Sequence, residues 1–336
     1  MEGEIGGEIG GEIGERDGGA SRHTGEHVRN MLHANGIDKV TAMKGSQTEQ
    51  SELANQIELA KASEPIELLA AQLVEWFRST ASDYVVALSG GVDSAVVAKA
   101  ASLAGEVNTV LVTGESPSLA RQELRDAISV AERVALPHVT LATGETKDPA
   151  YQANDARRCY HCKTHLFSSL EKQYPSAIIV TGTNADDLQD YRPGLQAASE
   201  HRVRAPLAEL GFDKQVVRRL AELWGLPIAE KPASPCLASR VAYGVEVTHE
   251  RLLMIERAEQ WLRERGLIEF RVRLHAGELA RIEVPLKELQ RLASQPIRTE
   301  LNVYFKSIGF RFVTLDLSGF SSGSLNQLIQ LDQLKR

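Results

Sequence analysis

The chain has 336 residues, of which 43% are hydrophobic and 25% charged, and its net charge at pH 7 is −7. This composition indicates a globular protein of about two domains, and the acidic balance argues against a dedicated nucleic-acid binder, which carries a basic excess. No stretch reaches the roughly 20 apolar residues of a membrane span, and the first residues lack the features of a secretory signal. Three cysteines are too few for a disulfide framework, so we expect a cytoplasmic protein.

Residues 1–62 predict a disordered tail rich in Gly and Glu. It opens with the repeat GEIGGEIGGEIGE, in which glycine is costly to order and one isoleucine per unit buries little surface. Two interpretations have equal weight, a functional arm and an accidental extension from a wrongly chosen start site. Order is predicted to begin near Pro65.

Helical and strand patterns alternate from residue 66 to residue 225. Helices are predicted at 66–77, 92–105, 118–136 and 212–225, and strands at 84–88, 108–114, 138–145 and 177–187, with a short fifth strand at 201–207. Ser118 is the predicted N-cap of the third helix. This alternation predicts an α/β fold with a doubly wound, mostly parallel sheet, whose ligands lie beyond the carboxyl ends of the strands.

The pattern changes after residue 240. A long helix at 248–266, strands at 270–275, 279–285 and 309–317, and a helix at 286–294 predict a smaller α+β unit. We therefore expect three parts, namely the tail, a nucleotide-binding domain at 63–240, and a C-terminal domain at 241–336 that serves the substrate or oligomerisation.

The loop SGGVDS joins the first strand to the helix that follows. Its residues are Ser89, Gly90, Gly91, Val92, Asp93 and Ser94. The glycines let backbone N–H groups turn toward one point at a helix N-terminus, which favours an anion with several oxygens. No lysine of the usual phosphate-binding string is present, so the loop suits a pyrophosphate that stays behind while the α-phosphorus is attacked. Asp93 would act through Mg²⁺; the alternative is a tight turn without a ligand.

SGGVDS resembles the PP-loop of the ATP pyrophosphatases, which split ATP into AMP and pyrophosphate. A second string, GTNADD, closes the fourth strand and is similar to strings of that superfamily. Asn184 and Asp187 are expected at the nucleotide and Asp186 at Mg²⁺, although Asn and Asp also serve simple turns. By position, Gly114 and Glu115 are the expected adenine pocket.

The string PCLASR, residues 235–240, closely resembles the LarE family. These ATP-dependent sulfur transferases help to build the nickel-pincer nucleotide of lactate racemase. The resemblance extends from about residue 66 to about residue 326. It implies that both carboxylates of pyridinium-3,5-biscarboxylic acid mononucleotide are adenylated and converted to thiocarboxylates. It also implies a homo-oligomer, since relatives form hexamers.

Three arginines are candidates for binding this anionic substrate. Arg240 belongs to PCLASR, and Arg271 and Arg273 alternate with a valine and so share one strand face. The alternative for the strand pair is a solvated edge. Glu259 and Glu283 are candidates for a second metal near the sulfur, with plain surface positions as an equal alternative.

The cysteines are Cys159 and Cys162 in RRCYHCK and Cys236 in PCLASR, all expected in loops. The simplest LarE-like proteins carry only the last and sacrifice its sulfur. Three thiolates can instead hold three irons of a [4Fe–4S] cluster and leave one iron for a sulfide, as the resemblance to three-cysteine members implies. Alternatives are zinc with His161 or His165, a disulfide, or unrelated thiols.

Three other functions compete with sulfur transfer to a nucleotide. A tRNA thiolase shares the PP-loop, but the acidic balance counts against an RNA platform. An amide-forming ligase such as GMP or NAD synthetase gives three cysteines no role. The third is an ATP-binding regulatory protein without turnover. A sulfur transferase of the cluster type also implies a sulfide source as a partner.

Overall fold

The computed structural model describes residues 64–188, 193–231 and 234–321. The predicted tail at 1–62 lies outside the described residues, as do residues 322–336. The first described helix, α3 (Ile66–Thr80), begins directly after Pro65, where order was predicted to start.

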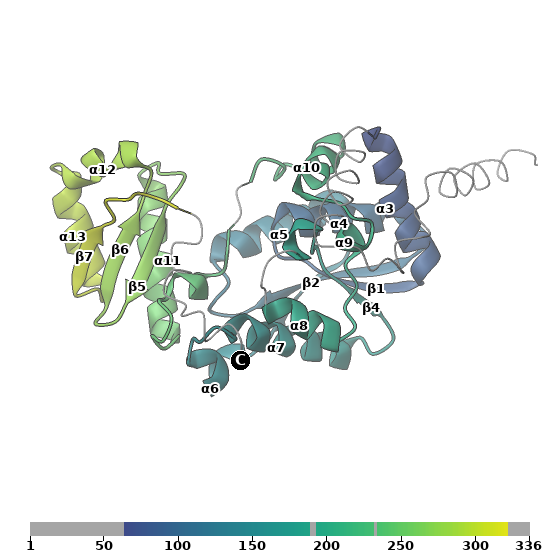
Figure 1. The fold of residues 1–336 in the computed structure, drawn as a ribbon, viewed down its shortest axis with the longest axis horizontal. Helices are drawn as coiled ribbons and strands as arrows, with labels where there is room; N and C mark the ends of the chain where they lie inside the picture. Colours follow the sequence, from purple (N-terminus) through teal and green to yellow (C-terminus); the bar gives the residue numbers. More distant parts are fainter. Residues whose placement is uncertain (1–63, 189–192, 232–233, 322–336) are drawn as a thin grey trace, which may run out of the picture. The chain divides into compact units, whose positions relative to one another are not determined.

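Four parallel strands form the larger sheet, in the order β3-β2-β1-β4 (Figure 1). They are β1 (Asp83–Ala87), β2 (Asn108–Glu115), β3 (His138–Ala142) and β4 (Ile178–Val180). Because every neighbouring pair is parallel, the carboxyl ends of all four strands meet at one edge. The predicted α/β fold is confirmed.

Helices cover both faces of this sheet (Figure 1). One face carries α3, α4 (Val92–Ala104), α5 (Arg121–Val134) and α10 (Lys214–Leu223), and the other carries α7 (Arg158–Gln173) and α8 (Pro193–Glu200). The strands alternate accordingly: Tyr84 and Val86 pack into the first layer, and Val85 packs into the second. The loops hold the short helices α6 (Pro149–Gln152) and α9 (Pro206–Glu209) and the 3₁₀ turns η2 (Glu145–Lys147) and η3 (Asp186–Leu188).

A second, smaller sheet follows residue 240. Its strands are β5 (Arg271–His275), β6 (Leu279–Glu283) and β7 (Phe312–Leu315), with β5 antiparallel and β7 parallel to β6. Its helices are α11 (His249–Glu264), α12 (Leu286–Ala293) and α13 (Ile297–Ser307). The predicted α+β unit is confirmed, and α13 was not predicted. The boundaries at residues 63, 240 and 241 stay predictions.

Two local predictions are wrong. Ser118 does not cap α5, which begins at Arg121 with Glu256 accepting a hydrogen bond from the Arg121 N–H at 2.7 Å. Ser118 is buried instead and donates to Glu145 at 3.1 Å. Residues 201–207 form no fifth strand, because α9 begins at Pro206 and only a single bridge joins Val180 to Arg204. No helix in the described ranges is long and apolar enough to cross a membrane.

Candidate active site

The loop between β1 and α4 forms a cradle at the carboxyl edge of the sheet. Gly90 has φ of 76°, and a Cβ there would lie 2.5 Å from the carbonyl oxygen of Glu123. The hydroxyls of Ser89 and Ser94 lie 3.1 Å apart, and Ser94 donates to the Gly91 carbonyl at 3.0 Å. Gly91 is the N-cap of α4 and no side chain caps the helix, which leaves its first N–H groups for an anion.

Asp93, in the first turn of α4, connects the cradle to two distant segments. Its Oδ1 accepts a hydrogen bond from Asn184 Nδ2 at 3.0 Å, and its Oδ2 lies 2.5 Å from Lys214 Nζ at the start of α10. Asn184 and Asp187 bond each other through backbone and side chain at 3.2 and 3.1 Å. Asp186 accepts from the Lys214 N–H at 3.0 Å. The structure therefore brings the predicted SGGVDS and GTNADD residues together.

Sequence reasoning missed two lysines at this cradle. Lys214 holds Asp93, and Lys231 Nζ lies 2.9 Å from the Gly90 carbonyl, 2.7 Å from Glu123 and 2.5 Å from Asp126. Neither lysine belongs to a motif, because both reach the loop only through the tertiary fold. Both ammonium groups lie beside the loop, where the usual phosphate-binding lysine is absent, and each is paired with carboxylates in this structure.

Gly182 also escaped notice, although it opens GTNADD. A Cβ at this position would lie 2.5 Å from the Ser94 nitrogen and 2.7 Å from the Asp93 carbonyl carbon. Only glycine permits the segment after β4 to run this close to the start of α4. A glycine directly after a buried strand was the available signal.

The expected adenine position lies at the end of β2. Gly114 faces Leu166 and Thr143, so a Cβ there would sit 3.0 and 3.1 Å from their side chains. A cavity of about 450 Å³ begins beside Glu115 and is bounded by the segment Glu115–Leu124 and by α11. That volume suits a small ligand.

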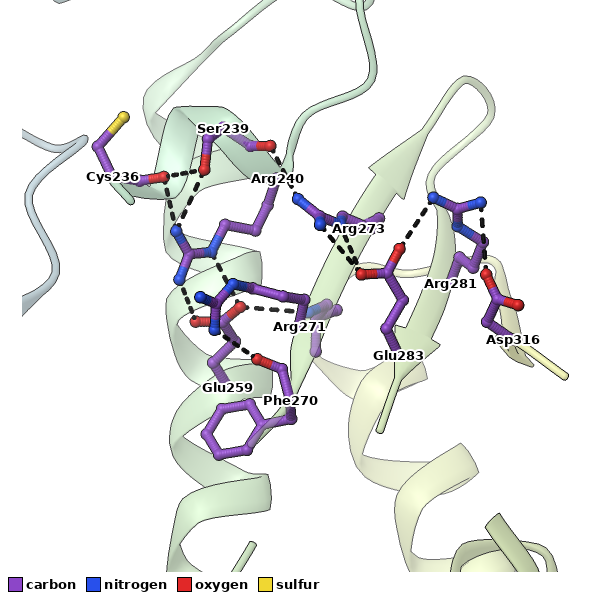
Figure 2. Close-up of polar contacts among 11 residues, drawn as sticks. Cys236, Ser239, Arg240, Glu259, Phe270, Arg271, Arg273, Arg281, Glu283 and Asp316 are labelled. Atoms are coloured by element: carbon purple, nitrogen blue, oxygen red, sulfur yellow. Dashed lines mark hydrogen bonds and ion pairs between the residues drawn. The ribbon is translucent and has the colours of Figure 1, made fainter. Parts of the chain in front are cut away.

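Cys236 directly precedes the 3₁₀ turn η4 (Leu237–Arg240), and Arg240 is the last residue of that turn (Figure 2). Cys236 is exposed, whereas Arg240 is buried with its Nε 3.0 Å from Glu259 of α11. Arg240 also donates to the backbone carbonyls of Pro235 and Cys236. The arginine therefore fixes the turn that carries the thiol. The Leu237 N–H donates to the Ser118 carbonyl at 2.8 Å, which ties the turn to the loop after β2.

Arg273 of β5 faces Glu283 of β6 in the same network (Figure 2). The two side chains lie 3.0 Å apart, and Glu283 is fully buried. Arg281 lies 3.0 Å from the other oxygen of Glu283 and 3.5 Å from Asp316, while Arg273 reaches back to the Ser239 carbonyl at 3.1 Å. Glu259 and Glu283 are thus occupied by arginines in this structure.

Arg271 stands beside this network, donating to the Phe270 carbonyl at 2.8 Å with the Phe320 ring 5.2 Å away. Burial lowers the pKa of Arg271, and the positive charge of Arg240 lowers it further. A cation held in a positive surrounding is stabilised by an incoming anion. The arginines predicted as substrate ligands therefore do gather in space.

The prediction that all three cysteines lie in loops is wrong for two of them. Cys159 and Cys162 lie in the first two turns of α7. The apolar residues Leu166, Phe167 and Leu170 of the same helix pack against the sheet. Cys159 is exposed, and Cys162 is partly exposed. Burial raises the pKa of Cys162 to about 12, and the thiols of Cys236 and Cys159 raise it further.

The thiols do not form a group that could hold a single metal ion. In the part of the chain that the structure describes, no three Cys, His, Asp or Glu side chains are grouped closely enough to hold one ion. His165, a candidate zinc ligand, has its Nε2 2.9 Å from Asp148. His161 stacks edge-on against Tyr160 with ring centroids 5.4 Å apart.

These features define a class of protein. A glycine-rich loop between a parallel strand and a helix N-terminus, with carboxylates at the next strand end, is the nucleotide site of an ATP-using PP-loop enzyme. The family model for NAD synthase matches residues 67–159, which include this loop.

Relatives define the family more closely. The chain is 35% identical over 253 residues to pyridinium-3,5-bisthiocarboxylic acid mononucleotide synthase of Lactiplantibacillus plantarum, with 74% of this chain and 91% of that protein covered. An uncharacterized protein of Synechocystis sp. is 44% identical over 251 residues, or 73% and 92% of the two chains. A tRNA-specific 2-thiouridylase of Azorhizobium caulinodans is 31% identical over 200 residues, or 45% and 49%. The chain belongs to the LarE family, that of the bisthiocarboxylic acid mononucleotide synthase.

Proposed function

We propose that the protein is an ATP-dependent sulfur transferase acting on pyridinium-3,5-biscarboxylic acid mononucleotide in nickel-pincer nucleotide biosynthesis. It adenylates each carboxylate and replaces AMP by sulfur, giving a thiocarboxylate. The observation that carries the proposal is the hydrogen bond of 2.8 Å from the Leu237 N–H to the Ser118 carbonyl. It attaches the Cys236 turn to the loop after β2, at the sheet edge that also holds the ATP cradle.

The cradle residues support the adenylation step. A carboxylate oxygen of the substrate attacks the α-phosphorus of ATP, the bond to the β-phosphate oxygen breaks, and pyrophosphate leaves. Ser89, Gly91 and the first N–H groups of α4 would hold that pyrophosphate, with Lys214 and Lys231 adding charge.

The carboxylates beside the cradle are proposed to share a magnesium ion with the phosphates of ATP, which would complete its ligands. Asp93, Asp186 and Asp187 offer hard oxygen donors, which Mg²⁺ prefers. When bound, Mg²⁺ would neutralise charge on the phosphates. Lys214 and Asn184 contact Asp93 and keep its carboxylate directed to the loop.

Substrate binding falls to the arginine network. Arg271 is the ligand we assign to the substrate phosphate or free carboxylate, and the ion pairs of Arg240 and Arg273 hold the strand and turn around it. Glu259 and Glu283 position these arginines. A second metal at the two glutamates remains the weaker proposal, because both carboxylates already bond arginines.

The three thiols are proposed to act as one sulfur-carrying site. Cys159 and Cys162 lie one turn apart at the start of α7, and Arg158, between them and the Cys236 turn, donates to the Ala238 carbonyl at 2.9 Å, so a direct contact joins the two cysteine-bearing segments. When bound to Cys159, Cys162 and Cys236, a [4Fe–4S] cluster would present a sulfide on its one iron without a protein ligand. The alternative is sacrifice of the Cys236 sulfur.

Competing functions account for less of the chain. The thiouridylase similarity covers 45% of this chain, and the NAD synthase match ends at residue 159, before the Cys236 turn. Both therefore concern the shared ATP chemistry. A cytoplasmic location, a homo-oligomer and a C-terminal domain that serves substrate or assembly complete the proposal.

Pyrophosphate release tests the reaction. Full-length protein with Mg²⁺ and ATP should release pyrophosphate only when pyridinium-3,5-biscarboxylic acid mononucleotide is added. The same rate with tRNA, or release with ammonia as the acceptor, would overturn the proposal in favour of a thiolase or an amide ligase.

Iron content and cysteine mass test the sulfur supply. Anaerobically reconstituted protein should carry about four irons, and replacing any one cysteine by Ala should abolish this loading. Repeated turnover with added sulfide and an unchanged Cys236 mass supports the cluster. Single turnover in iron-free protein, with Cys236 converted to dehydroalanine, supports sacrifice.

A further inference from the structure

The segment after β7 forms a turn against β6. Its first residue, Asp316, donates its N–H to the Ile282 carbonyl at 2.9 Å, and its side chain lies 3.5 Å from Arg281. The Asp316 carboxylate and carbonyl then accept the N–H groups of Ser318 and Gly319 at 2.8 and 3.1 Å, which closes the turn. The segment is therefore held in place by bonds that do not involve a ligand.

This turn brings Phe320 to the side of Arg271. The Phe320 N–H donates to the Val284 carbonyl at 2.9 Å, and Val284 directly follows Glu283, the residue opposite Arg271 in the register of β5 and β6. The guanidinium carbon of Arg271 lies 5.2 Å from the centroid of the Phe320 ring, which is within the range of a cation–π contact. Both residues are partly exposed, so the pair can be reached from solvent.

The arginines of this network make contacts of two kinds. Arg240 and Arg273 each lie 3.0 Å from a buried glutamate, whose carboxylate offsets the charge. The contacts of Arg271 include the Phe270 carbonyl at 2.8 Å and the face of the Phe320 ring. A ring face attracts a guanidinium through its quadrupole, leaves the net charge of the pair positive, and does not use the in-plane N–H donors. Such a contact suits an arginine whose charge serves a ligand.

A fixed position matters for a ligand-binding arginine. Its long side chain loses rotamer freedom when it binds an anion, and a side chain that is already held loses less. Arg240 and Arg273 belong to the same network (Figure 2), and their like charges repel the guanidinium of Arg271. The Phe320 ring supplies an attraction that opposes this repulsion and keeps the guanidinium in place before the substrate arrives.

We propose that Phe320 is the positioning residue of the substrate-binding arginine. Its ring holds the Arg271 guanidinium by a cation–π contact and directs the N–H donors toward an anionic group of the nucleotide substrate, its phosphate or free carboxylate. The proposal rests on the proposed function, in which Arg271 binds that substrate. It gives a role to the segment after β7, to which the sequence analysis assigned none.

The variants are Phe320→Leu, Phe320→Tyr and the matched control Phe312→Leu, all in full-length protein. Leucine keeps the apolar bulk without a ring, and tyrosine keeps the ring. Phe312 is an exposed phenylalanine of β7 in the same sheet. Substrate-dependent pyrophosphate release gives kcat and the KM values for ATP and for pyridinium-3,5-biscarboxylic acid mononucleotide.

Phe320→Leu should raise the KM for the nucleotide substrate about five- to thirtyfold, the effect of losing one cation–π contact at a partly buried site. The turnover number kcat should stay unchanged, and the KM for ATP should change by less than about twofold, because the lost contact serves substrate binding alone. Phe320→Tyr should keep the wild-type values, as should Phe312→Leu. In the Arg271→Ala background, Phe320→Leu should change the substrate KM by less than about twofold, since a positioning residue acts only through the residue that it positions.

An unchanged substrate KM in Phe320→Leu would overturn the proposal. An undiminished effect of this change in the Arg271→Ala background would also refute it, because the ring would then act independently of the arginine. An equal rise of both KM values would reduce Phe320 to a merely structural residue. Should Phe320→Leu fail to fold in a melting experiment, Phe320→Met, whose flexible side chain fills a similar volume, decides in its place.

The proposed function fails separately. Wild-type protein that releases no pyrophosphate with the nucleotide substrate would overturn that function, and the role of Phe320 with it. An active wild type combined with any of the contrary results above would refute the role of Phe320 alone.

Discussion

Lys214 Nζ lies 2.5 Å from Asp93 Oδ2, although the two residues are 121 positions apart in the chain. Asp93 starts the helix of the ATP loop, and Lys214 starts α10. The pair places a flexible cation beside an anion cradle that lacks a lysine of its own. In the proposed function Mg²⁺ and ATP bind at Asp93, and the Lys214 ammonium group then becomes available to contact phosphate.

The first prediction concerns this pair. Asp93→Ala should lower substrate-dependent pyrophosphate release about a hundredfold or more, because the carboxylate is the expected metal ligand at the phosphates. Lys214→Met should weaken ATP binding about ten- to a hundredfold, the effect of one charge-assisted contact. Calorimetric titration with ATP checks the second variant, with the exposed Lys172→Met as its control. Normal ATP affinity in Lys214→Met would show that the lysine serves only the empty site.

Gly182 allows a steric prediction. Gly182→Ala places a Cβ 2.5 Å from the Ser94 nitrogen, so β4 or the loop must shift. Overpacking of this kind costs about 1–3 kcal/mol of folding free energy, and the shift of the loop that relieves it should weaken ATP binding measurably. Gly194→Ala is the matched control, since its nearest neighbour at 3.1 Å is the flexible Lys163 side chain. Equal ATP affinity of both variants would contradict the close approach.

Local sequence patterns predicted most of the fold. Buried runs such as residues 84–88 and the glycine stop at Gly105 predicted β1 and α4 nearly to the residue, because those signals depend on neighbours in sequence. The resemblance of SGGVDS and PCLASR to known motifs predicted which segments form the site. The short α13 and the true start of α5 were missed, since their ends depend on packing and on Glu256.

Contacts over long sequence distances explain what sequence reasoning missed at the site. Nothing around Lys231 indicates that it will reach Gly90, and a single serine at position 118 gives no sign that its carbonyl will hold the Cys236 turn. A sequence motif identifies the residues expected to carry out the chemistry. The residues that hold them in place are identified only once the fold is known.

Within the arginine network, Arg271 is proposed to bind the substrate, whereas Arg273 stabilises the fold. Arg273→Ala removes a partner of the fully buried Glu283, and breaking such a pair costs about 3–5 kcal/mol. The retained bond from Arg281 should reduce that loss, but the melting temperature should fall clearly. Arg271→Ala should lower the melting temperature less than Arg273→Ala does and weaken use of the nucleotide substrate about ten- to a hundredfold, with ATP binding intact. Thermal melts and steady-state kinetics on both variants check this, and a reversal of the two phenotypes would exchange their roles.

The thiols should differ in reactivity before any metal is added. Burial raises the pKa of Cys162 to about 12, and a thiol with a raised pKa becomes the reactive thiolate only as the pH rises toward that value. At pH 8 iodoacetamide should therefore modify the exposed Cys159 and Cys236 first, and modification of Cys162 should accelerate with increasing pH. Peptide mass spectrometry over a time course gives the three rates. In urea the burial is lost, so Cys162 should react like an ordinary thiol with a pKa of about 8.5. Modification of Cys162 as fast as Cys236 in the folded protein at pH 8 would show that its sulfur is not shielded from water.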